Sequence, residues 1–191
     1  MRRGETLSRI YLYDGPFEKG EAGYPLVQLA GERYAQEMGL NYDFSSAQIC
    51  REEKGKPYFV DIPLEFSLSH SGQMWMCIVS DSPCGLDLQQ IRACSFEAVA
   101  GRQYSEEEQH YTALWGIEGF FDIWVRKEAF VKCTGQGLFS HMPSVAGKDG
   151  DLCRTVRWKG KQYFFTDIDI GPELRCSVCS EKELSIEMRL L

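Results

Sequence analysis

The sequence lacks both a long hydrophobic run and an excess of positive charge. No stretch approaches the roughly 20 consecutive apolar residues of a membrane-spanning helix, so we do not expect an integral membrane protein. The 21 Lys and Arg residues are outnumbered by 28 Asp and Glu residues, which gives a formal net charge of −7. This charge argues against a protein that binds nucleic acid through bulk positive charge. An anionic ligand or an acidic partner would need a local group of basic side chains.

The N-terminal residues, Met-Arg-Arg-Gly-Glu, lack the apolar segment of a secretory signal peptide. We therefore expect a cytoplasmic protein whose eight cysteines are reduced thiols, most of them in the core, and not a disulfide framework. Cys176 and Cys179 have the Cys-x-x-Cys spacing of zinc ligands. No second Cys or His pair has such spacing, so we reject a zinc site.

The 191 residues are 43% hydrophobic and 13% aromatic, which is typical of a well-packed globular protein of one large or two small domains. Apolar spacing and turn residues predict an alternation of strands and helices. We expect strands at 8–13, 48–53, 65–69, 73–80, 84–90, 152–158, 162–170, 174–180 and 184–190, and helices at 25–40, 94–102, 105–115 and 121–133. A hairpin turn at Asp81-Ser-Pro83 is expected to join two of the strands. The order predicts an α+β fold of two similar halves, residues 1–92 and 93–191.

The segment from Phe121 to Lys132 places a carboxylate and an ammonium group in an apolar setting that is rich in aromatic residues. A helix brings Glu128 and Lys132 onto one face, one turn apart. Such a pair is ordinary when it faces solvent. Beside Trp124 and Phe130 it is a candidate acid–base pair.

Two further segments offer polar groups for a ligand. The first is Gly55-Lys-Pro-Tyr-Phe59, a turn whose Lys56 either faces solvent or contacts a ligand. The second is Phe66-Ser-Leu-Ser-His-Ser-Gly72, whose hydroxyls, imidazole and backbone N–H groups suit phosphate oxygens. Turn-forming serines are the alternative interpretation. A serine hydrolase is disfavoured because the segment is not a Gly-x-Ser-x-Gly elbow.

A third segment, Gly85-Leu-Asp-Leu-Gln89, reads as a buried strand that carries a carboxylate. Strand alternation places Asp87 and Gln89 on one face and their leucine neighbours on the other. A buried carboxylate is costly unless it meets a cation. Oxygen ligands of this kind suit Mg²⁺ better than a transition metal.

Together, the four segments resemble the 4′-phosphopantetheinyl transferases of the surfactin-synthetase-activating type. The order is Gly-Lys-Pro, then Ser-x-Ser-His-Ser-Gly, then Gly-x-Asp, then Trp-x-x-Lys-Glu-Ala-x-x-Lys. The last element is the most diagnostic, and Gly85-Leu-Asp is the next. The resemblance is strong from Gly55 to Leu138 and weaker through the C-terminal strands.

The resemblance implies a Mg²⁺-dependent enzyme that transfers the phosphopantetheine arm of coenzyme A to a serine of an apo carrier protein and releases adenosine 3′,5′-bisphosphate. It implies a monomer, a pseudo-twofold pair of α+β halves, and an active site in the cleft between them. Asp87, Gln89 and Glu128 would be the metal ligands. Glu128, or a water that it orients, would also take the proton of the carrier serine, and Lys132 would neutralise or protonate the leaving phosphate. The positions that match coenzyme A contacts are Lys56, Ser69, His70, Asp87 and Lys132.

The chain departs from the family pattern at two places. Gln89 stands where the family usually has a glutamate, which removes one negative charge from the metal site. The N-terminal region offers only Lys19 and Arg33 where the family has basic contacts to the 3′-phosphate. A non-catalytic relative that binds a carrier protein or coenzyme A is therefore one alternative. A Mg²⁺-dependent phosphohydrolase of nucleotide pyrophosphates is another.

Recognition of an acidic carrier protein would need basic or apolar surface residues. Arg92, Arg102 and Arg126 are candidates for the basic contacts. A hydrophobic groove along 104–115 is a candidate for the apolar contact.

Overall fold

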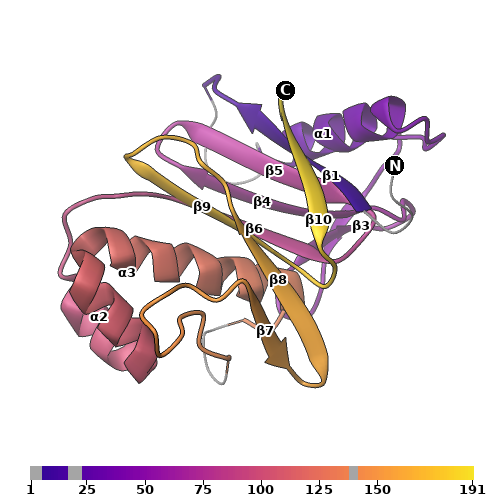
Figure 1. Cartoon of the computed structure of the whole chain (residues 1–191). Coiled ribbons are helices and arrows are strands. Elements are labelled where there is room, and N and C mark those ends of the chain that lie inside the picture. The colour runs from indigo at the N-terminus through magenta and orange to yellow at the C-terminus, as the bar shows by residue number, and fades with distance from the viewer. Residues whose placement is uncertain (1–5, 17–22, 138–141) are drawn as a thin grey trace.

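The computed structural model describes residues 6–16, 23–137 and 142–191. It contains two four-stranded sheets that lie next to each other, and a helix packs on each of them (Figure 1). The elements in chain order are β1 (Thr6–Tyr13), α1 (Gly23–Glu37), β2 (Ile49–Arg51), β3 (Pro57–Phe59), β4 (Glu65–Ser71), β5 (Met74–Ser80), β6 (Cys84–Gln90), α2 (Phe96–Gln103), α3 (Glu106–Thr134), β7 (Thr155–Trp158), β8 (Lys161–Asp167), β9 (Leu174–Ser180) and β10 (Leu184–Leu190). The α+β class that the sequence predicts is confirmed. No helix in the described ranges is long and apolar enough to cross a membrane.

The first sheet has the strand order β10-β1-β5-β4 and packs against α1. Val27, Ala30 and Tyr34 recur at helical spacing on the buried face of α1, where they join Phe66 and Trp75 of the sheet in one core. β1 pairs antiparallel with β5 and parallel with β10.

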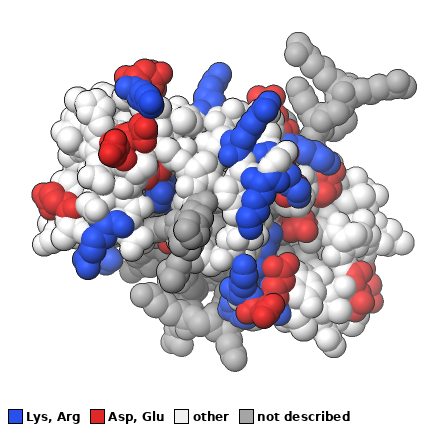
Figure 2. Space-filling model, turned by 90° about the horizontal axis from the view of Figure 1, so that it is seen from below, with Lys and Arg blue, Asp and Glu red and all other residues white. Residues whose placement is uncertain are grey.

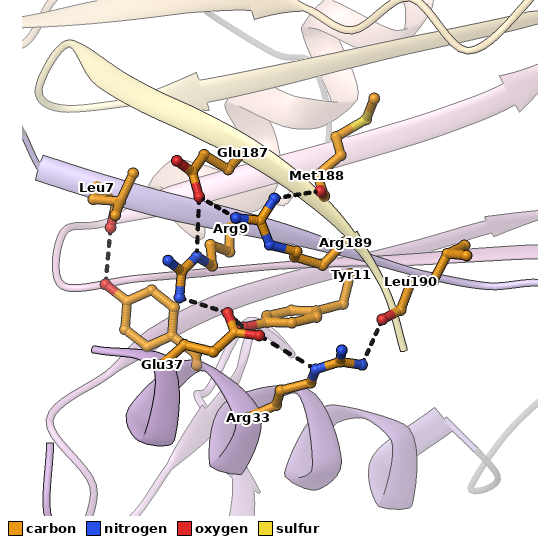
Figure 3. A network of polar contacts seen from close by, with 10 residues as sticks. Leu7, Arg9, Tyr11, Arg33, Glu37, Glu187, Met188, Arg189 and Leu190 are labelled. Carbon is orange, nitrogen blue, oxygen red and sulfur yellow. Dashed lines mark hydrogen bonds and ion pairs between the residues drawn. The ribbon is translucent and has the colours of Figure 1, made fainter. Parts of the chain in front are cut away.

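Ion pairs and hydrogen bonds attach β10 to the rest of the first layer (Figure 3). The guanidinium of Arg9 on β1 contacts Glu37 of α1 at 2.5 Å and Glu187 of β10 at 3.4 Å. Arg33 of α1 donates a hydrogen bond to the backbone carbonyl of Leu190 at 2.5 Å. A strand from the last part of the sequence is thus bound to the first strand and to the first helix.

The second sheet has the order β6-β9-β8-β7, and α3 packs on it. Phe130 of α3 meets Tyr163 of β8 edge to face, with ring centroids 5.0 Å apart. Ser105 begins α3 with a capping box. Gly116, at φ 60°, ψ −138°, bends the helix between the two segments that the sequence predicts as separate helices.

A buried ion pair joins the two segments of α3 across this bend. Glu108 is fully buried, and both of its carboxylate oxygens accept from the Lys127 ammonium at 3.0 and 3.1 Å. The carboxylate also accepts from the backbone N–H groups of Ser105 at 2.9 Å and Val145 at 3.0 Å. These hydrogen bonds satisfy the buried carboxylate, and together with the attraction between the two charges they offset much of the cost of burying the pair.

A row of serine hydroxyls joins the edge strands of the two sheets, β4 and β6. Three alternate hydroxyls on β4 accept hydrogen bonds from three alternate backbone N–H groups on β6. The pairs are Ser67 with Leu86 at 2.9 Å, Ser69 with Leu88 at 3.1 Å, and Ser71 with Gln90 at 2.8 Å. The row sets the register between the two sheets, so these serines are strand residues and not turn formers.

The predicted hairpin between the strands at 73–80 and 84–90 is wrong. β5 pairs with β1 and β4, whereas β6 pairs with β9. The Asp81-Ser-Pro83 segment is therefore the point at which the chain crosses from one sheet to the other. Turn residues predict a change of direction but not which strand the chain meets next.

The two sheets repeat one topology: β1-β5-β4 and β6-β9-β8 each place the last of three strands between the other two. In each case a helix lies between the first two strands in the sequence. This order is what two related halves would have, and it favours a boundary near 81–83. The boundary between 1–92 and 93–191, like the pseudo-twofold relation, stays a prediction.

Gly85 lets α3 approach β6 closely. A Cβ at this position would lie 2.0 Å from the carbonyl oxygen of Ala129 and 2.4 Å from the backbone nitrogen of Cys133. Both atoms belong to the backbone of α3, so a side chain at position 85 would have to push the helix away from the strand.

We expect Gly85→Ala to lower the free energy of unfolding by about 2 kcal/mol or more, because the added methyl group overpacks a backbone contact. Gly101→Ala is the matched control: Gly101 lies in α2 with nothing within 4 Å of an added Cβ. This change should be neutral or stabilise the helix by up to about 1 kcal/mol. Urea denaturation measures both, and equal effects of the two changes would contradict the close-contact argument.

Candidate functional site

The buried carboxylate of Asp87 is the centre of the site. Asp87 is 2% exposed on β6. Its Oδ1 atom accepts hydrogen bonds from Ser69 Oγ at 2.8 Å and Lys132 Nζ at 2.7 Å, and its Oδ2 atom accepts from Gln89 Nε2 at 3.2 Å. The predicted common face of Asp87 and Gln89 is confirmed. Three donors, one of them the positively charged Lys132 ammonium, compensate the loss of water around the carboxylate.

Lys132 of α3 connects both sheets at this point. Besides Asp87, its ammonium donates to the backbone carbonyl of Leu68 on β4 at 3.2 Å and to that of Leu86 on β6 at 3.0 Å. An ammonium has three N–H donors, so all of them are committed.

Glu128 lies one helical turn before Lys132 and is only partly buried. Burial raises the pKa of its carboxyl group first, the negative charge of Asp87 raises it further, and Lys132 lowers it. Among the described residues it has no hydrogen bond or ion pair, since the Lys132 ammonium lies on Asp87. Two carboxylates therefore repel each other here, and only one of them has a cation.

The donor set at this place fits a hard cation with few protein ligands. In the part of the chain that the structure describes, no group of three or more His, Cys, Asp and Glu side chains could hold a metal ion. Two carboxylates, Asp87 and Glu128, are a sufficient protein contribution for Mg²⁺, which keeps waters and substrate oxygens as its other ligands. A bound cation would also relieve the repulsion that raises the pKa of Glu128.

A cavity of about 310 Å³ adjoins this cluster. It is lined by the start of α1, the β2–β3 hairpin, the middle of β4 and the end of α3. Four cationic side chains line it, and none of its described lining residues is an acid: the cations are Arg51, Lys54, Lys56 and Lys132. This is the local basic group that an anionic ligand of an acidic protein needs. Lys and Arg side chains also gather on one face of the molecule (Figure 2).

Lys56 is held inside the structure and is not a solvated turn residue. Its side chain is 11% exposed and contacts Glu65 of β4 at 3.4 Å. It also donates to the carbonyl of Cys133, near the C-terminal end of α3, at 3.2 Å. Gly55, at φ 91°, makes the turn that directs Lys56 toward the helix.

The structure brings together most of the residues that the sequence singles out. Ser69, Asp87, Gln89 and Lys132 form one hydrogen-bonded cluster with Glu128 beside it, and Lys132 also lines the cavity with Lys56. His70 lies on β4, two residues beyond the cavity-lining Leu68 and on the same face of the strand.

Three basic residues that the sequence analysis names lie outside the site or outside the described residues. Arg126 is 5% exposed and binds Asp167 and the Cys153 carbonyl, so the prediction of a surface contact is wrong for it. Arg33 binds Glu37 and β10 away from the cavity. Lys19 lies outside the described residues.

Arg51 and Lys54 also line the cavity, but no sequence motif singled them out. Their signal was available: three basic residues fall within the six positions 51–56. Glu52 and Glu53 lie between Arg51 and Lys54, so the segment has little net charge in the sequence. Only the structure shows that neither acid lines the cavity.

The stretch that carries Asp87, Glu128 and Lys132 matches a known family. A model of the 4′-phosphopantetheinyl transferase superfamily matches residues 83–185. The chain is 30% identical over 149 residues to the 4′-phosphopantetheinyl transferase gsp of Aneurinibacillus migulanus, covering 74% of this chain and 61% of that relative. It is 27% identical over 148 residues to the 4′-phosphopantetheinyl transferase Sfp of Bacillus subtilis strain 168, covering 72% and 65%. The chain thus spans less than two thirds of the length of either relative.

Removing the charge of Glu128 should stabilise the protein. Because the pKa of Glu128 is raised in the folded state, its ionised form destabilises the fold above its usual pKa range, and this cost disappears as the pH falls. Without metal, at about pH 7.5, Glu128→Gln should therefore raise the melting temperature, by about 2–4 °C for each kcal/mol gained. The gain should shrink toward about pH 4. Glu183→Gln, an exposed control, should change little, and a lower melting temperature for Glu128→Gln would contradict the pKa argument.

Ser69 should contribute more to stability than its neighbour in the serine row. Ser67→Ala removes one acceptor for a β6 N–H group, whereas Ser69→Ala also removes a donor to the buried Asp87 carboxylate. We expect a loss of about 1 kcal/mol for the first and about 2–3 kcal/mol for the second. Urea denaturation of both variants tests this difference, and equal losses would show that the bond to Asp87 adds nothing.

Proposed function

The chain belongs to the 4′-phosphopantetheinyl transferase superfamily, and from this premise we propose that it transfers the 4′-phosphopantetheine group of coenzyme A to a serine of an apo carrier protein. The carrier would be an acyl, peptidyl or aryl carrier, and adenosine 3′,5′-bisphosphate would be released. The observation that carries this proposal is that Lys132, which lines a cavity together with three other cationic residues, binds Asp87 and has Glu128 beside it.

Asp87 and Glu128 are the proposed Mg²⁺ ligands, with the Gln89 amide as a third oxygen. When bound, Mg²⁺ would supply positive charge to the pyrophosphate of coenzyme A. Support comes from the chemistry of the donors, namely two neighbouring carboxylates that repel each other.

Glu128 is the proposed general base. A serine hydroxyl is a poor nucleophile at neutral pH and needs a positioned acceptor for its proton. The carboxyl group of Glu128 has no hydrogen bond or ion pair among the described residues, so it is free to accept that proton.

Lys132 is proposed to neutralise the leaving phosphate. Its three N–H donors are all committed to Leu68, Leu86 and Asp87. To donate to a phosphate, the ammonium has to release one of these partners. A cation bound to Asp87 could take the place of Lys132 there, and Lys132 already lines the cavity.

Lys56, Ser69 and His70 are the remaining proposed coenzyme A contacts. Lys56 lines the cavity, and its part in binding is supported by that position. The Ser69 hydroxyl both accepts and donates within the protein, so its contribution would be to hold Asp87 in place. His70 would reach the ligand from the same face of β4 as Leu68.

The proposal includes a monomeric enzyme in the cytoplasm, with no nucleic acid and no membrane as partners. All eight cysteines are free thiols, which fits a reducing compartment. Arg92 and Arg102, both exposed, stay candidates for contact with an acidic carrier protein. So do the exposed Leu114 and Trp115, at the end of the predicted groove.

The second candidate is a non-catalytic relative that binds a carrier protein or coenzyme A. The observation that favours it is Gln89, whose amide gives Asp87 a hydrogen bond instead of adding a negative charge to the metal site. Catalysis and binding alone are separated by the mass of the carrier protein.

We expect incubation with coenzyme A, Mg²⁺ and a panel of apo carrier proteins to add one phosphopantetheine group to a carrier, measured by mass spectrometry. Glu128→Gln should lower the transfer rate by about 10²- to 10⁴-fold, because it removes the base. Glu183→Gln is the charge-matched control and should retain the rate.

Full transfer by Glu128→Gln would contradict the assignment of the base. Binding of coenzyme A with no mass gain on any carrier would favour the non-catalytic relative. Breakdown of coenzyme A without a carrier would favour a phosphohydrolase.

A further inference from the structure

We propose that Ser177 is a positioning residue whose hydroxyl holds Asp87 when Lys132 releases that carboxylate for a ligand phosphate. Ser177 lies in β9, outside the four segments that carry the family resemblance. The inference rests on the proposed function, because it takes Asp87 as a Mg²⁺ ligand and Lys132 as the group that moves.

The hydroxyl of Ser177 is buried without a partner. The residue is 0% exposed, and its Oγ atom has no hydrogen-bond partner among the described residues. A hydroxyl in this position has lost water and gained no bond in exchange, so it destabilises the state in which it is found. An alanine would fill nearly the same space without this cost. The hydroxyl is therefore explained best by another state of the protein, in which it has a partner.

The strand register places Ser177 directly beside Asp87. β6 and β9 are antiparallel, and the two residues are partners in this pairing. Partner side chains lie on the same face of a sheet, with Cβ atoms about 4.5–5.5 Å apart. At this separation, rotation of the serine side chain brings its hydroxyl within reach of the carboxylate.

The face that the two residues share is the one that α3 covers (Figure 1). On β6, Gly85 lies against the backbone of α3, and Asp87, two residues later, has the same orientation. On β9, Arg175 binds Asp122 of α3 at 2.7 Å, and Ser177 is again two residues later. Ser177 and Asp87 therefore both lie between the sheet and α3.

Asp87 has a serine on each side, and in this state it uses only one of them. Ser69 of β4 donates to its Oδ1 atom at 2.8 Å, and Lys132 donates to the same oxygen at 2.7 Å. The other two acceptors of Lys132 are carbonyls of β4 and β6. The carboxylate is thus held from the β4 side, while the Ser177 hydroxyl on the β9 side bonds neither of its oxygens.

The proposed chemistry removes one of the bonds on the β4 side. All three donors of Lys132 are committed, so a contact with phosphate costs the ammonium one partner. When that partner is Asp87, the carboxylate loses its one hydrogen bond from a charged donor, which is the strong kind. The Ser177 hydroxyl replaces this bond from the β9 side with no movement of the backbone. Asp87 then keeps two hydroxyl donors and a fixed position as a metal ligand.

The other neighbour of Ser177 does not need this hydroxyl. Asp167 of β8 is the partner of Ser177 on the opposite side. Arg126 donates to both of its carboxylate oxygens, and the Asp167 side chain is 47% exposed. Asp87 is therefore the carboxylate that gains from Ser177.

The first test compares the melting temperatures of Ser177→Ala and its matched control, Ser82→Ala. The Ser82 hydroxyl is also buried without a partner among the described residues, but Ser82 lies in the segment that crosses between the sheets. Without ligand, both variants should melt about 2–4 °C above the wild-type protein, because each loses an unsatisfied hydroxyl. A lower melting temperature for Ser177→Ala would show that its hydroxyl stabilises the resting protein and would overturn the inference.

The second test is isothermal titration calorimetry of Mg²⁺ into the full chain saturated with coenzyme A. Ser177→Ala should bind Mg²⁺ about 3- to 10-fold more weakly than the wild-type protein, which corresponds to one lost hydrogen bond. Ser82→Ala should bind it as the wild-type protein does. The Mg²⁺ concentration that gives half of the maximal rate of carrier modification should rise by the same factor for Ser177→Ala.

Unchanged Mg²⁺ affinity of Ser177→Ala, or an equal loss in Ser82→Ala, would overturn the inference and leave the proposed function intact. Weaker Mg²⁺ binding by Ser177→Ala alone, in a protein that modifies no carrier, would support the positioning role and reject the proposed function. Absence of Mg²⁺ binding by the wild-type protein would overturn both the inference and the proposed metal site.

Discussion

The ion pair between Asp87 and Lys132 is the interaction on which the rest of the site depends. It places a carboxylate of β6 and an ammonium of α3 at the line where the two sheets meet, and the ammonium also binds carbonyls of β4 and β6. Burying these charges is costly, and the cost is offset by Ser69, Gln89 and the carbonyls. Gly85 makes the pair possible, because no side chain separates α3 from the strand.

The neighbouring residues Lys127 and Glu128 show how one helix serves two purposes. Adjacent residues point about 100° apart on a helix, so opposite charges that follow each other in the sequence meet different surroundings. Lys127 turns into the core and binds the fully buried Glu108, which holds the bend at Gly116. Glu128 turns toward Asp87, where burial and like charge raise its pKa. The first residue stabilises the helix, and the second carries the proposed chemistry.

Local sequence patterns predicted the features that depend only on residues close together in the sequence. Most strands and the shared face of Asp87 and Gln89 follow from spacing alone. Partners distant in the sequence were not predictable in this way. The hairpin at Asp81-Ser-Pro83 was wrong because the choice of a strand partner depends on the whole sheet. The role of the serine row in joining β4 and β6, and the place of Arg51 and Lys54 in the cavity lining, become visible only when separate elements are placed together.

The parallel pairing of β10 with β1 has a consequence for how the protein folds. Residue 9 and residue 187, whose side chains meet across these strands, are 178 positions apart in the sequence. On the ribosome, β1 emerges early, and its edge toward β10 stays open until residues 184–190 have been synthesised. Pairings of such high contact order form slowly and leave strand edges exposed to other chains in the meantime. The first sheet is therefore completed only after nearly all the described chain has been made, and until then β1 keeps an open edge.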